Sequence, residues 1–185
     1  MDYYDNVATH FQHHIEHLSL SVDAIADILG SGAELIHQAL LADKKVFCCG
    51  IGLDASTAVL FSELMTRGLG RERPALPAVE LASRFGVLPE SAQLWMSGQI
   101  QAQGQPGDVA LIFAGSLEHH HVSALAATIN KRRMQPIWVG TQGPGVSLTF
   151  LGTSPACNLA LCHASVICLA ELIDIMTFGP MEDML

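Results

Sequence analysis

Four histidines near the N-terminus have the spacing of metal ligands on one face of a helix. They are His10, His13, His14 and His17. The i, i+3, i+4, i+7 pattern brings such side chains together on a helix. Neutral imidazole is a common ligand of Zn²⁺ and Ni²⁺, so this face could hold a zinc ion. The alternative interpretation is a polar helix face or a subunit interface that uses histidine.

Two glycine-containing turns, each at the end of a short apolar run, form a second candidate site. Glycine lets a ligand approach the backbone, and the start of the following helix favours an anion. Asp54 opens the helix after the first turn as its predicted N-cap. A histidine triplet opens the helix after the second turn and could bind an anion, titrate near pH ~6.5 or simply be solvated. The candidate ligand-binding residues are Gly50, Gly52, Asp54, Ser116, Glu118 and His119.

The five cysteines lack the pattern of a metal or disulfide site. Their number is odd and no CxxC pair occurs. Two lie in one apolar run and three along one apolar helix: Cys48, Cys49, Cys157, Cys162 and Cys168. We therefore expect reduced, buried cysteines that pack as small hydrophobic residues in a cytoplasmic protein.

The elements that must position these residues alternate between strands and helices. Short apolar runs predict strands at 45–49, 76–79, 108–113, 135–140 and 148–151. Helical spacing predicts two helices within 4–42, broken at Gly30-Ser31-Gly32, and further helices at 54–67, 90–103, 119–131 and 156–177. This alternation predicts an α/β fold with a doubly wound, five-stranded parallel sheet.

We expect one domain over residues 1–185, with N-terminal helices at 1–42 and an α/β core at 43–185. Ligands of such folds bind outside the carboxyl ends of the strands, at the topological switch point. The loops 50–54 and 114–119 are expected there.

The composition favours self-association and disfavours nucleic acid or membrane as a partner. Half of the residues are hydrophobic and 15% are charged. The sequence nevertheless contains no run of about 18 uninterrupted apolar residues, which a membrane-spanning helix would need. The acidic, histidine-rich N-terminus does not look like a signal peptide. The helix at 156–177 is apolar on nearly every face, which predicts burial within the fold or in a homotetramer or dimer. A net charge of −9 argues against direct binding of nucleic acid and fits a basic or neutral protein partner.

Four segments carry a resemblance to the sugar isomerase (SIS) family. Their order and spacing match the KxxxxGNG(G/T)S start of these domains, then the R-P-x-L-P-A and GxxGD segments of the phosphoheptose isomerase branch, then a C-terminal Leu-Ile-Asp. In this chain they are residues 45–52, 72–78, 104–109 and 172–174. The resemblance implies a flavodoxin-like SIS domain. The same branch includes the DnaA initiator-associating protein DiaA, a non-enzymatic homotetramer.

The resemblance also implies where catalytic and zinc-binding residues should lie, and this chain departs from that pattern. The family's HxxxE pair falls on Leu60 and Leu64, and its QxxxxxxxH pair on Leu159 and Ile167. Aliphatic side chains cannot transfer a proton. Glu63 lies one position away, about 100° around the helix, and is the remaining catalytic candidate.

The anion-binding positions of the family are altered as well. Its first serine is replaced by Asp54, and Glu118 adds a second carboxylate beside the retained Ser116. Two negative charges facing a phosphate should cost on the order of several kcal/mol.

Three hypotheses remain from the sequence. The leading one is a non-catalytic, oligomeric scaffold similar to DiaA, with a replication initiator protein as partner and Phe178 and Leu185 as docking residues; packing on the helices is the alternative for Phe178. The second is a sedoheptulose-7-phosphate isomerase with a displaced active site. The third is a sensor that binds a phosphorylated sugar or a nucleotide sugar without chemistry.

Overall fold

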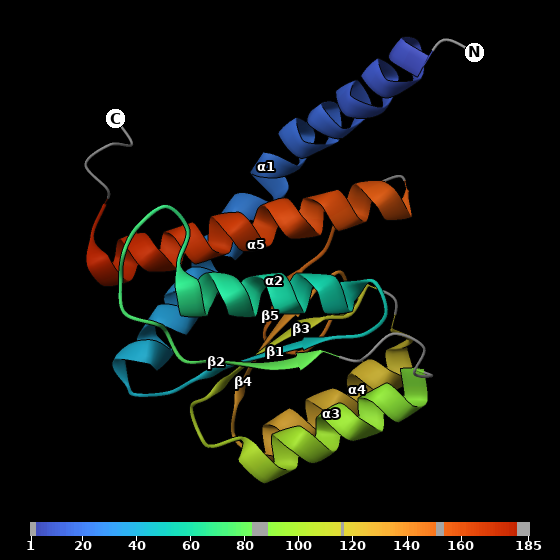
Figure 1. Cartoon of the computed structure of the whole chain (residues 1–185). Coiled ribbons are helices and arrows are strands. Elements are labelled where there is room, and N and C mark those ends of the chain that lie inside the picture. Colours follow the sequence, from blue (N-terminus) through green and yellow to red (C-terminus); the bar gives the residue numbers. More distant parts are fainter. Residues whose placement is uncertain (1–2, 83–88, 116, 151–153, 181–185) are drawn as a thin grey trace.

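A parallel sheet of five strands runs through the structure, with helices on both faces (Figure 1). The computed structural model describes residues 3–82, 89–115, 117–150 and 154–180. The strands are β1 (Val46–Gly50), β2 (Ala78–Ala82), β3 (Val109–Phe113), β4 (Gln135–Val139) and β5 (Val146–Leu148). The helices are α1 (Tyr3–Leu41), α2 (Asp54–Arg67), α3 (Pro89–Gln103), α4 (His119–Lys131) and α5 (Pro155–Phe178). The strand order β2-β1-β3-β4-β5 confirms the predicted doubly wound α/β fold.

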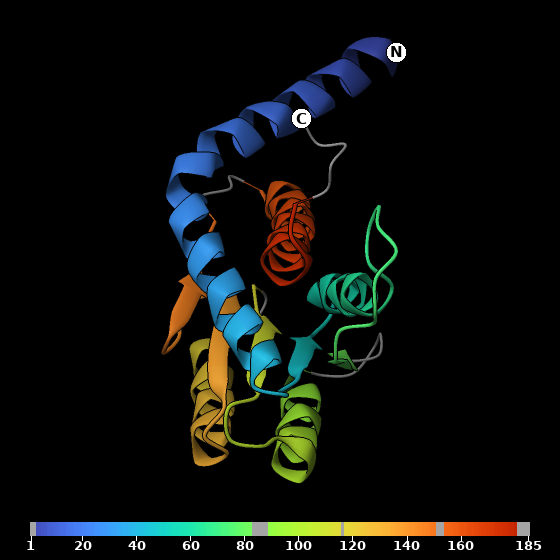
Figure 2. The same ribbon diagram turned by 90° about the vertical axis from the view of Figure 1, so that its left-hand side faces the viewer.

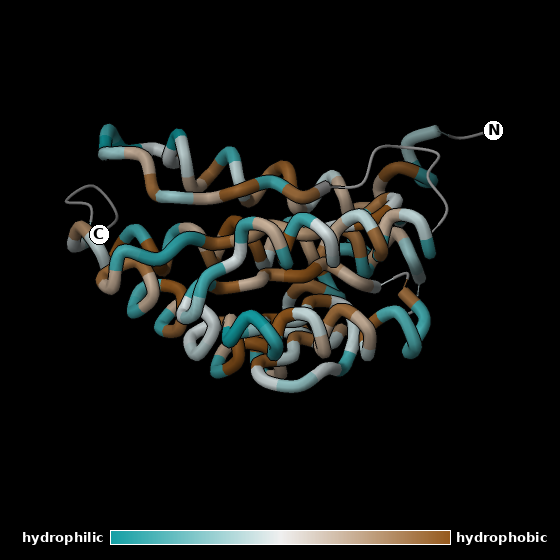
Figure 3. Tube along the Cα trace, turned by 90° about the horizontal axis from the view of Figure 1, so that it is seen from below, coloured by the Kyte–Doolittle hydropathy of each residue, from teal (hydrophilic) through white to brown (hydrophobic). Residues whose placement is uncertain are grey.

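The helices form one layer on each face of the sheet. α1, α2 and α5 cover one face, and α3 and α4 cover the other (Figures 1 and 2). Val46 and Cys48 of β1 belong to the core under the first layer. Phe47 and Cys49 belong to the core under the second. Burial on both faces explains why the strands are continuous apolar runs in the sequence. Brown and teal stretches alternate along the helices in Figure 3, as expected for helices with one side on the sheet.

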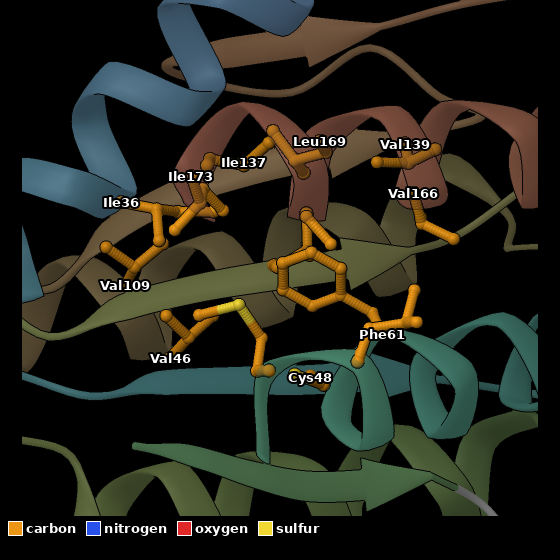
Figure 4. Packing of buried hydrophobic residues seen from close by; sticks show 14 of the residues in the cluster. Ile36, Val46, Cys48, Phe61, Val109, Ile137, Val139, Val166, Leu169 and Ile173 are labelled. Atoms are coloured by element: carbon orange, nitrogen blue, oxygen red, sulfur yellow. The ribbon is translucent and has the colours of Figure 1, made fainter. Parts of the chain in front are cut away.

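The core under α1, α2 and α5 joins side chains from all three helices to the sheet (Figure 4). Ile36 of α1, Phe61 of α2 and Ile173 of α5 are each fully buried in it. Full burial of such a side chain contributes roughly 1.5–3 kcal/mol. These contacts hold the C-terminal helix and the second half of α1 in the domain.

The prediction of two N-terminal helices was wrong, because α1 continues through Gly30-Ser31-Gly32. Gly32 is buried, and the point where its Cβ would lie is 3.8 Å from Leu169 Cδ1, so this turn of α1 packs against α5. The Ser31 hydroxyl donates to the Asp27 carbonyl at 2.9 Å and so stays within the helix. Two glycines cost roughly 1 kcal/mol each in a helix, and tertiary packing outweighs that cost.

The start of β2 differs from the prediction because of a proline. The predicted strand began at Leu76, whereas β2 begins at Ala78. Pro77 has no N–H for the ladder, and its carbonyl accepts a hydrogen bond from the Val46 N–H at 3.0 Å. The Leu76 N–H donates instead to the Met65 carbonyl at 3.0 Å, which ties the segment to α2.

Two further expectations shift by a few residues. β5 is Val146–Leu148 and not 148–151; it starts directly after Gly145, whose φ of +92° makes the turn into it. Residue 151 lies outside the described residues. Asp54 is the first residue of α2, and Leu53 occupies the N-cap position without a side-chain cap. A carboxylate in the first turn is still favourable, because the helix N-terminus carries partial positive charge.

The four segments that carry the family resemblance are joined in pairs by two largely buried ion pairs. Asp108 is buried and accepts hydrogen bonds from the Lys45 N–H at 3.1 Å and the Gln105 N–H at 2.8 Å; the Lys45 ammonium pairs with it at 2.7 Å. Arg73 Nε lies 2.8 Å from Asp174 Oδ1, and both side chains are nearly excluded from solvent. These charged residues therefore fix the entry to the sheet and the position of α5.

Of the described helices, α5 alone is long and apolar enough to cross a membrane. In this fold it lies against α1 and α2. Its buried Asp174 pairs with Arg73, and Leu169 and Ile173 belong to the core. α5 thus has the contacts of a core helix, in agreement with the predicted burial.

Candidate functional site

A pocket of about 440 Å³ opens at the carboxyl ends of β1, β3 and β4. In the strand order, β2 lies on one side of β1 and β3 lies on the other, so the order reverses at β1. The pocket therefore lies at the topological switch point, where this fold class binds ligands. Its described lining residues are Ile51, Gly52, Leu53, Asp54, Gly115, Gly140, Phe150, Pro155, Asn158, Leu159 and Cys162. A pocket therefore lies at the position where the sequence predicts the ligand site.

Glycines bring the backbone segments of the pocket together. A Cβ on Gly50 would lie 2.5 Å from the Asp54 carbonyl oxygen, so only glycine lets α2 start so close to β1. A Cβ on Gly140 would lie 2.8 Å from the Gly115 Cα, and the φ of Gly140 is +86°. The ends of β3 and β4 therefore touch backbone to backbone, and this contact forms the floor of the pocket.

A carboxylate projects over that floor. The point where a Cβ of Gly115 would lie is 3.7 Å from both carboxylate oxygens of Asp54. Burial, and after it the negative charge of Asp54, raise the pKa of the Cys162 thiol to about 12. Cys162 is therefore a neutral thiol at physiological pH. Among the described lining residues, Asp54 is the one that carries a carboxyl group.

Asn158 lines the same pocket from the first turn of α5. Its Oδ1 is buried and has no hydrogen-bond partner among the described residues. An amide oxygen without a partner is costly, and a hydroxyl group of a ligand would satisfy it. Asp54, Asn158 and Cys162 together offer an acceptor, an amide and a thiol to a polar ligand.

The predicted ligand-binding residues are only partly brought together. Gly52 and Asp54 line the pocket, and Gly50 is buried behind it. Ser116 lies outside the described residues. The prediction that Glu118 faces the ligand was wrong, because its side chain is 79% exposed, lies 3.4 Å from His120, and does not line the pocket.

His119 is exposed at the start of α4 and does not line the pocket either. Its ring nitrogen lies 3.4 Å from the Ser123 hydroxyl, one turn further along the helix. The histidine triplet therefore begins a helix outside the pocket.

The catalytic candidate Glu63 also lies elsewhere. It is exposed on α2 and forms an ion pair with Arg67 at 2.6 Å, one turn along the helix. It is not among the residues that line the pocket. The physical reason is the one-position offset: the neighbouring Leu60 and Leu64 pack toward the core, and Glu63 points to solvent.

The four positions implied for acid, base and zinc carry no donor atoms. Leu159 lines the pocket, whereas Leu60, Leu64 and Ile167 pack against the core. Zinc needs nitrogen, sulfur or oxygen ligands. These residues therefore do not fit the zinc ion that the resemblance implies, and no step of a reaction can pass through it there.

Two remaining candidates lie far from the pocket or outside the described residues. Phe178 is half-buried at the end of α5, with the guanidinium groups of Arg71 and Arg73 at 5.4 and 5.7 Å from its ring centroid. It also packs against the core. Leu185 is not among the described residues.

Residues that the sequence did not indicate complete the pocket: Gly140, Phe150, Asn158 and Cys162. The sequence did contain a signal for Gly140: it follows the carboxyl end of the strand beside β3, and ligands of this fold class bind outside the carboxyl ends of the strands. Asn158 is the one strongly polar residue in the first turns of an apolar helix, and this was an overlooked signal.

The sheet order and the switch-point pocket define the class of SIS-type sugar isomerase domains. The phosphoheptose isomerase of Francisella tularensis superposes with a TM-score of 0.81 at 20% identity, covering 94% of this chain and 99% of that one. The phosphoheptose isomerase of Neisseria gonorrhoeae superposes with a TM-score of 0.78 at 23% identity, covering 92% of this chain and 98% of that one. The sugar isomerase domain of an RpiR transcription factor from Sphaerobacter thermophilus superposes with a TM-score of 0.61 at 17% identity, covering 89% of this chain and 87% of that one. At these identities the likeness concerns the fold.

Sequence relatives narrow the class to one family. The phosphoheptose isomerase of Thiobacillus denitrificans is 31% identical over 153 residues, covering 80% of this chain and 78% of the relative. The phosphoheptose isomerase of Methylococcus capsulatus is 28% identical, and the match covers 97% of this chain and 100% of the relative. No protein-family model matches the chain. The chain belongs to the phosphoheptose isomerase family.

Proposed function

We propose that this chain isomerises a phosphoheptose in the switch-point pocket, with Asp54 in place of the acid/base residues it lacks. The observation that carries the proposal is the Asp54 carboxylate over the backbone floor, beside Asn158 and Cys162. The names of the relatives support the same class of reaction. This differs from the leading hypothesis of the sequence, in which the fold has no catalytic role.

The proposed chemistry requires one base. In a ketose, the base removes a proton from C1 and returns it to C2, while the hydroxyl proton on O1 passes to O2, so that an aldose forms with no net loss of atoms. A carboxylate within hydrogen-bond reach of both carbons could shuttle this proton. The Asn158 amide would hydrogen-bond the intermediate enediol. The Cys162 thiol, with a pKa of about 12, stays protonated and cannot act as the base.

The charge of Asp54 also sets the direction of the ligand. A carboxylate repels a phosphate by on the order of several kcal/mol at short range, but it accepts hydrogen bonds from hydroxyl groups. The sugar end is therefore expected over the floor of the pocket, and the phosphate toward solvent.

An isomerase assay tests the proposal. Purified protein would be incubated with sedoheptulose 7-phosphate, with added zinc and separately with a chelator, and product formation followed. We expect turnover that Asp54→Asn abolishes and that Glu63→Gln leaves unchanged, because Glu63 lies outside the pocket. Calorimetric binding of the sugar phosphate to Asp54→Asn separates lost chemistry from lost binding. Absent turnover, or turnover unaffected by Asp54→Asn, would contradict the proposal.

A second candidate function is a non-catalytic, oligomeric scaffold. The aliphatic residues at the four implied acid, base and zinc positions favour it. So does α1, whose first half exposes Phe11 at 63%, Ile15 at 64% and Leu20 at 73%, a surface suited to a second copy of the chain in a dimer or homotetramer. A replication initiator protein is the partner implied by the resemblance to DiaA, and the five free cysteines fit a location in the cytoplasm.

Two measurements distinguish this candidate from the isomerase. Light scattering gives the oligomer size, and a pull-down with the replication initiator tests the partner. A monomer that captures no initiator would eliminate the scaffold. A thermal-shift screen addresses the sensor hypothesis: stabilisation by a sugar phosphate without turnover would support it, and an unchanged melting temperature would oppose it.

A further inference from the structure

A histidine pair on α1 meets a cysteine at the start of α5. The Cys157 Sγ lies 3.5 Å from the His13 Nδ1, although the two residues are 144 positions apart in the sequence. One ligand atom from each of His13, His17 and Cys157 lies within 4.8 Å of the others. The ring centroids of the two histidines, one helical turn apart, lie 4.5 Å from each other, with the ring planes tilted by 59°. The sequence indicated the histidines but not the thiol.

We propose that His13, His17 and Cys157 form a binding site for a zinc-type divalent cation. This inference goes beyond the proposed function and does not rest on it. Tetrahedral zinc with Zn–S of about 2.3 Å and Zn–N of about 2.0–2.1 Å places nitrogen and sulfur about 3.5 Å apart. The separation between His13 Nδ1 and Cys157 Sγ is the same. His17 would supply the third ligand, and the fourth position would be left to water or another donor.

The local sequence fixes the thiol in place. Ser154 caps α5, and its hydroxyl accepts a hydrogen bond from the Cys157 N–H at 3.2 Å. Pro155 in the first turn makes the helix start rigid. Cys157 is buried and so has little rotamer freedom. A cysteine binds a metal through its thiolate sulfur.

The neighbouring histidines have a different surrounding. His10 and His14 form a second pair, in edge-to-face contact with 4.4 Å between ring centroids. The metal-ligand group contains neither His10 nor His14. They therefore serve as matched controls.

The ligand set also restricts the kind of metal. Thiolate and imidazole suit Zn²⁺ and other borderline or soft ions, whereas Mg²⁺ and Ca²⁺ prefer oxygen ligands. The bound ion would join the exposed first half of α1 to the first turn of α5. Pro155 and Asn158, on either side of Cys157, line the switch-point pocket, so the ion would also stiffen one wall of it.

The test uses the full chain, freshly reduced and free of metal. Titration with Co²⁺ should give one ion per chain, with the near-ultraviolet thiolate charge-transfer band and the intense visible bands of a tetrahedral site. Zn²⁺ should displace it and raise the melting temperature. Cys157→Ser and His13→Gln should remove the charge-transfer band or weaken Zn²⁺ binding by more than about 100-fold, since even outer-shell partners of a metal cost 10–100-fold. His14→Gln and Cys168→Ser should leave both unchanged.

Three results would overturn the site. The first is Co²⁺ binding without a charge-transfer band, which means binding by histidines alone. The second is a Cys157→Ser variant that is folded by circular dichroism and binds Zn²⁺ like the wild type. The third is an equal loss of binding in His14→Gln and His13→Gln. Because His13 is exposed, its substitution cannot unfold the core, so this variant remains informative if Cys157→Ser fails to fold.

Discussion

Replacing Arg73 by methionine should destabilise the fold more than any other single charge removal near α2. The Arg73 guanidinium donates to the carbonyls of Leu64 and Met65 at 2.8 Å each, and its Nε lies 2.8 Å from Asp174 Oδ1. The side chains of Arg73 and Asp174 are only 2% and 9% exposed. The substitution therefore leaves a buried carboxylate and two carbonyls at the end of α2 without their partner.

The magnitude follows from that geometry. Breaking a buried ion pair by removing one partner costs about 3–5 kcal/mol, a large part of the stability of a domain. For a domain of this size, about 4 kcal/mol lowers the melting temperature by roughly 8–16 °C. Urea denaturation followed by circular dichroism measures the free energy of unfolding directly.

Two variants make this result interpretable. Arg67→Met removes the exposed partner of Glu63 on the same helix, where we expect a loss of no more than about 0.5 kcal/mol. The double variant Arg73→Met/Asp174→Leu should recover much of the stability, because an apolar pair can replace a buried ion pair. If Arg73→Met cost no more than Arg67→Met, the ion pair would not hold α5 in place.

The remaining predictions concern glycines and thiols. Gly140→Ala should lower the free energy of unfolding by about 1–3 kcal/mol, because the φ of Gly140 is +86° and the new Cβ would meet the Gly115 backbone. Gly98→Ala, in open space on α3, should raise the free energy of unfolding by about 0.5–1 kcal/mol. Urea denaturation measures both changes, and changes of the same sign in the two variants would contradict this prediction. Burial raises the pKa of Cys49 and Cys162 to about 12 from 9.0, so unfolded chains lose these protons above pH 9 while folded chains keep them. The unfolding free energy should therefore fall with rising pH from about 9 to 12, by about 1.4 kcal/mol per thiol at pH 10, and the fall should be smaller in Cys49→Ala.

The fold was largely predictable because each strand is an apolar run that ends in a turn signal. The errors have local causes. Gly30-Ser31-Gly32 is a helix breaker by propensity, but the packing of Gly32 on α5 decides the outcome. The start of β2 depends on Pro77, whose missing N–H matters only once the register with β1 is known.

The candidate site was predictable only on the side of the glycine turns. Asp54 was found because it follows a glycine turn and opens a helix. Cys162 and Asn158 were not, because α5 is apolar on all faces and its periodicity does not indicate which side meets the pocket. The contact of His13 with Cys157 joins residues that are 144 positions apart in the sequence, and a local sequence pattern cannot predict that they are close in space.

The floor of the pocket has a consequence for how this protein can change over evolution. A Cβ on Gly140 would lie 2.8 Å from the Gly115 Cα, so position 140 cannot accept a side chain without moving a strand, whereas a Cβ on Gly115 would make only ordinary contacts. New ligand preferences are therefore expected at the walls, at Asp54, Asn158 and Leu159, and not at position 140. A family with such a floor can exchange its chemistry by a few wall substitutions while the sheet beneath stays the same, and a combinatorial library restricted to these three positions is where a new specificity should be sought.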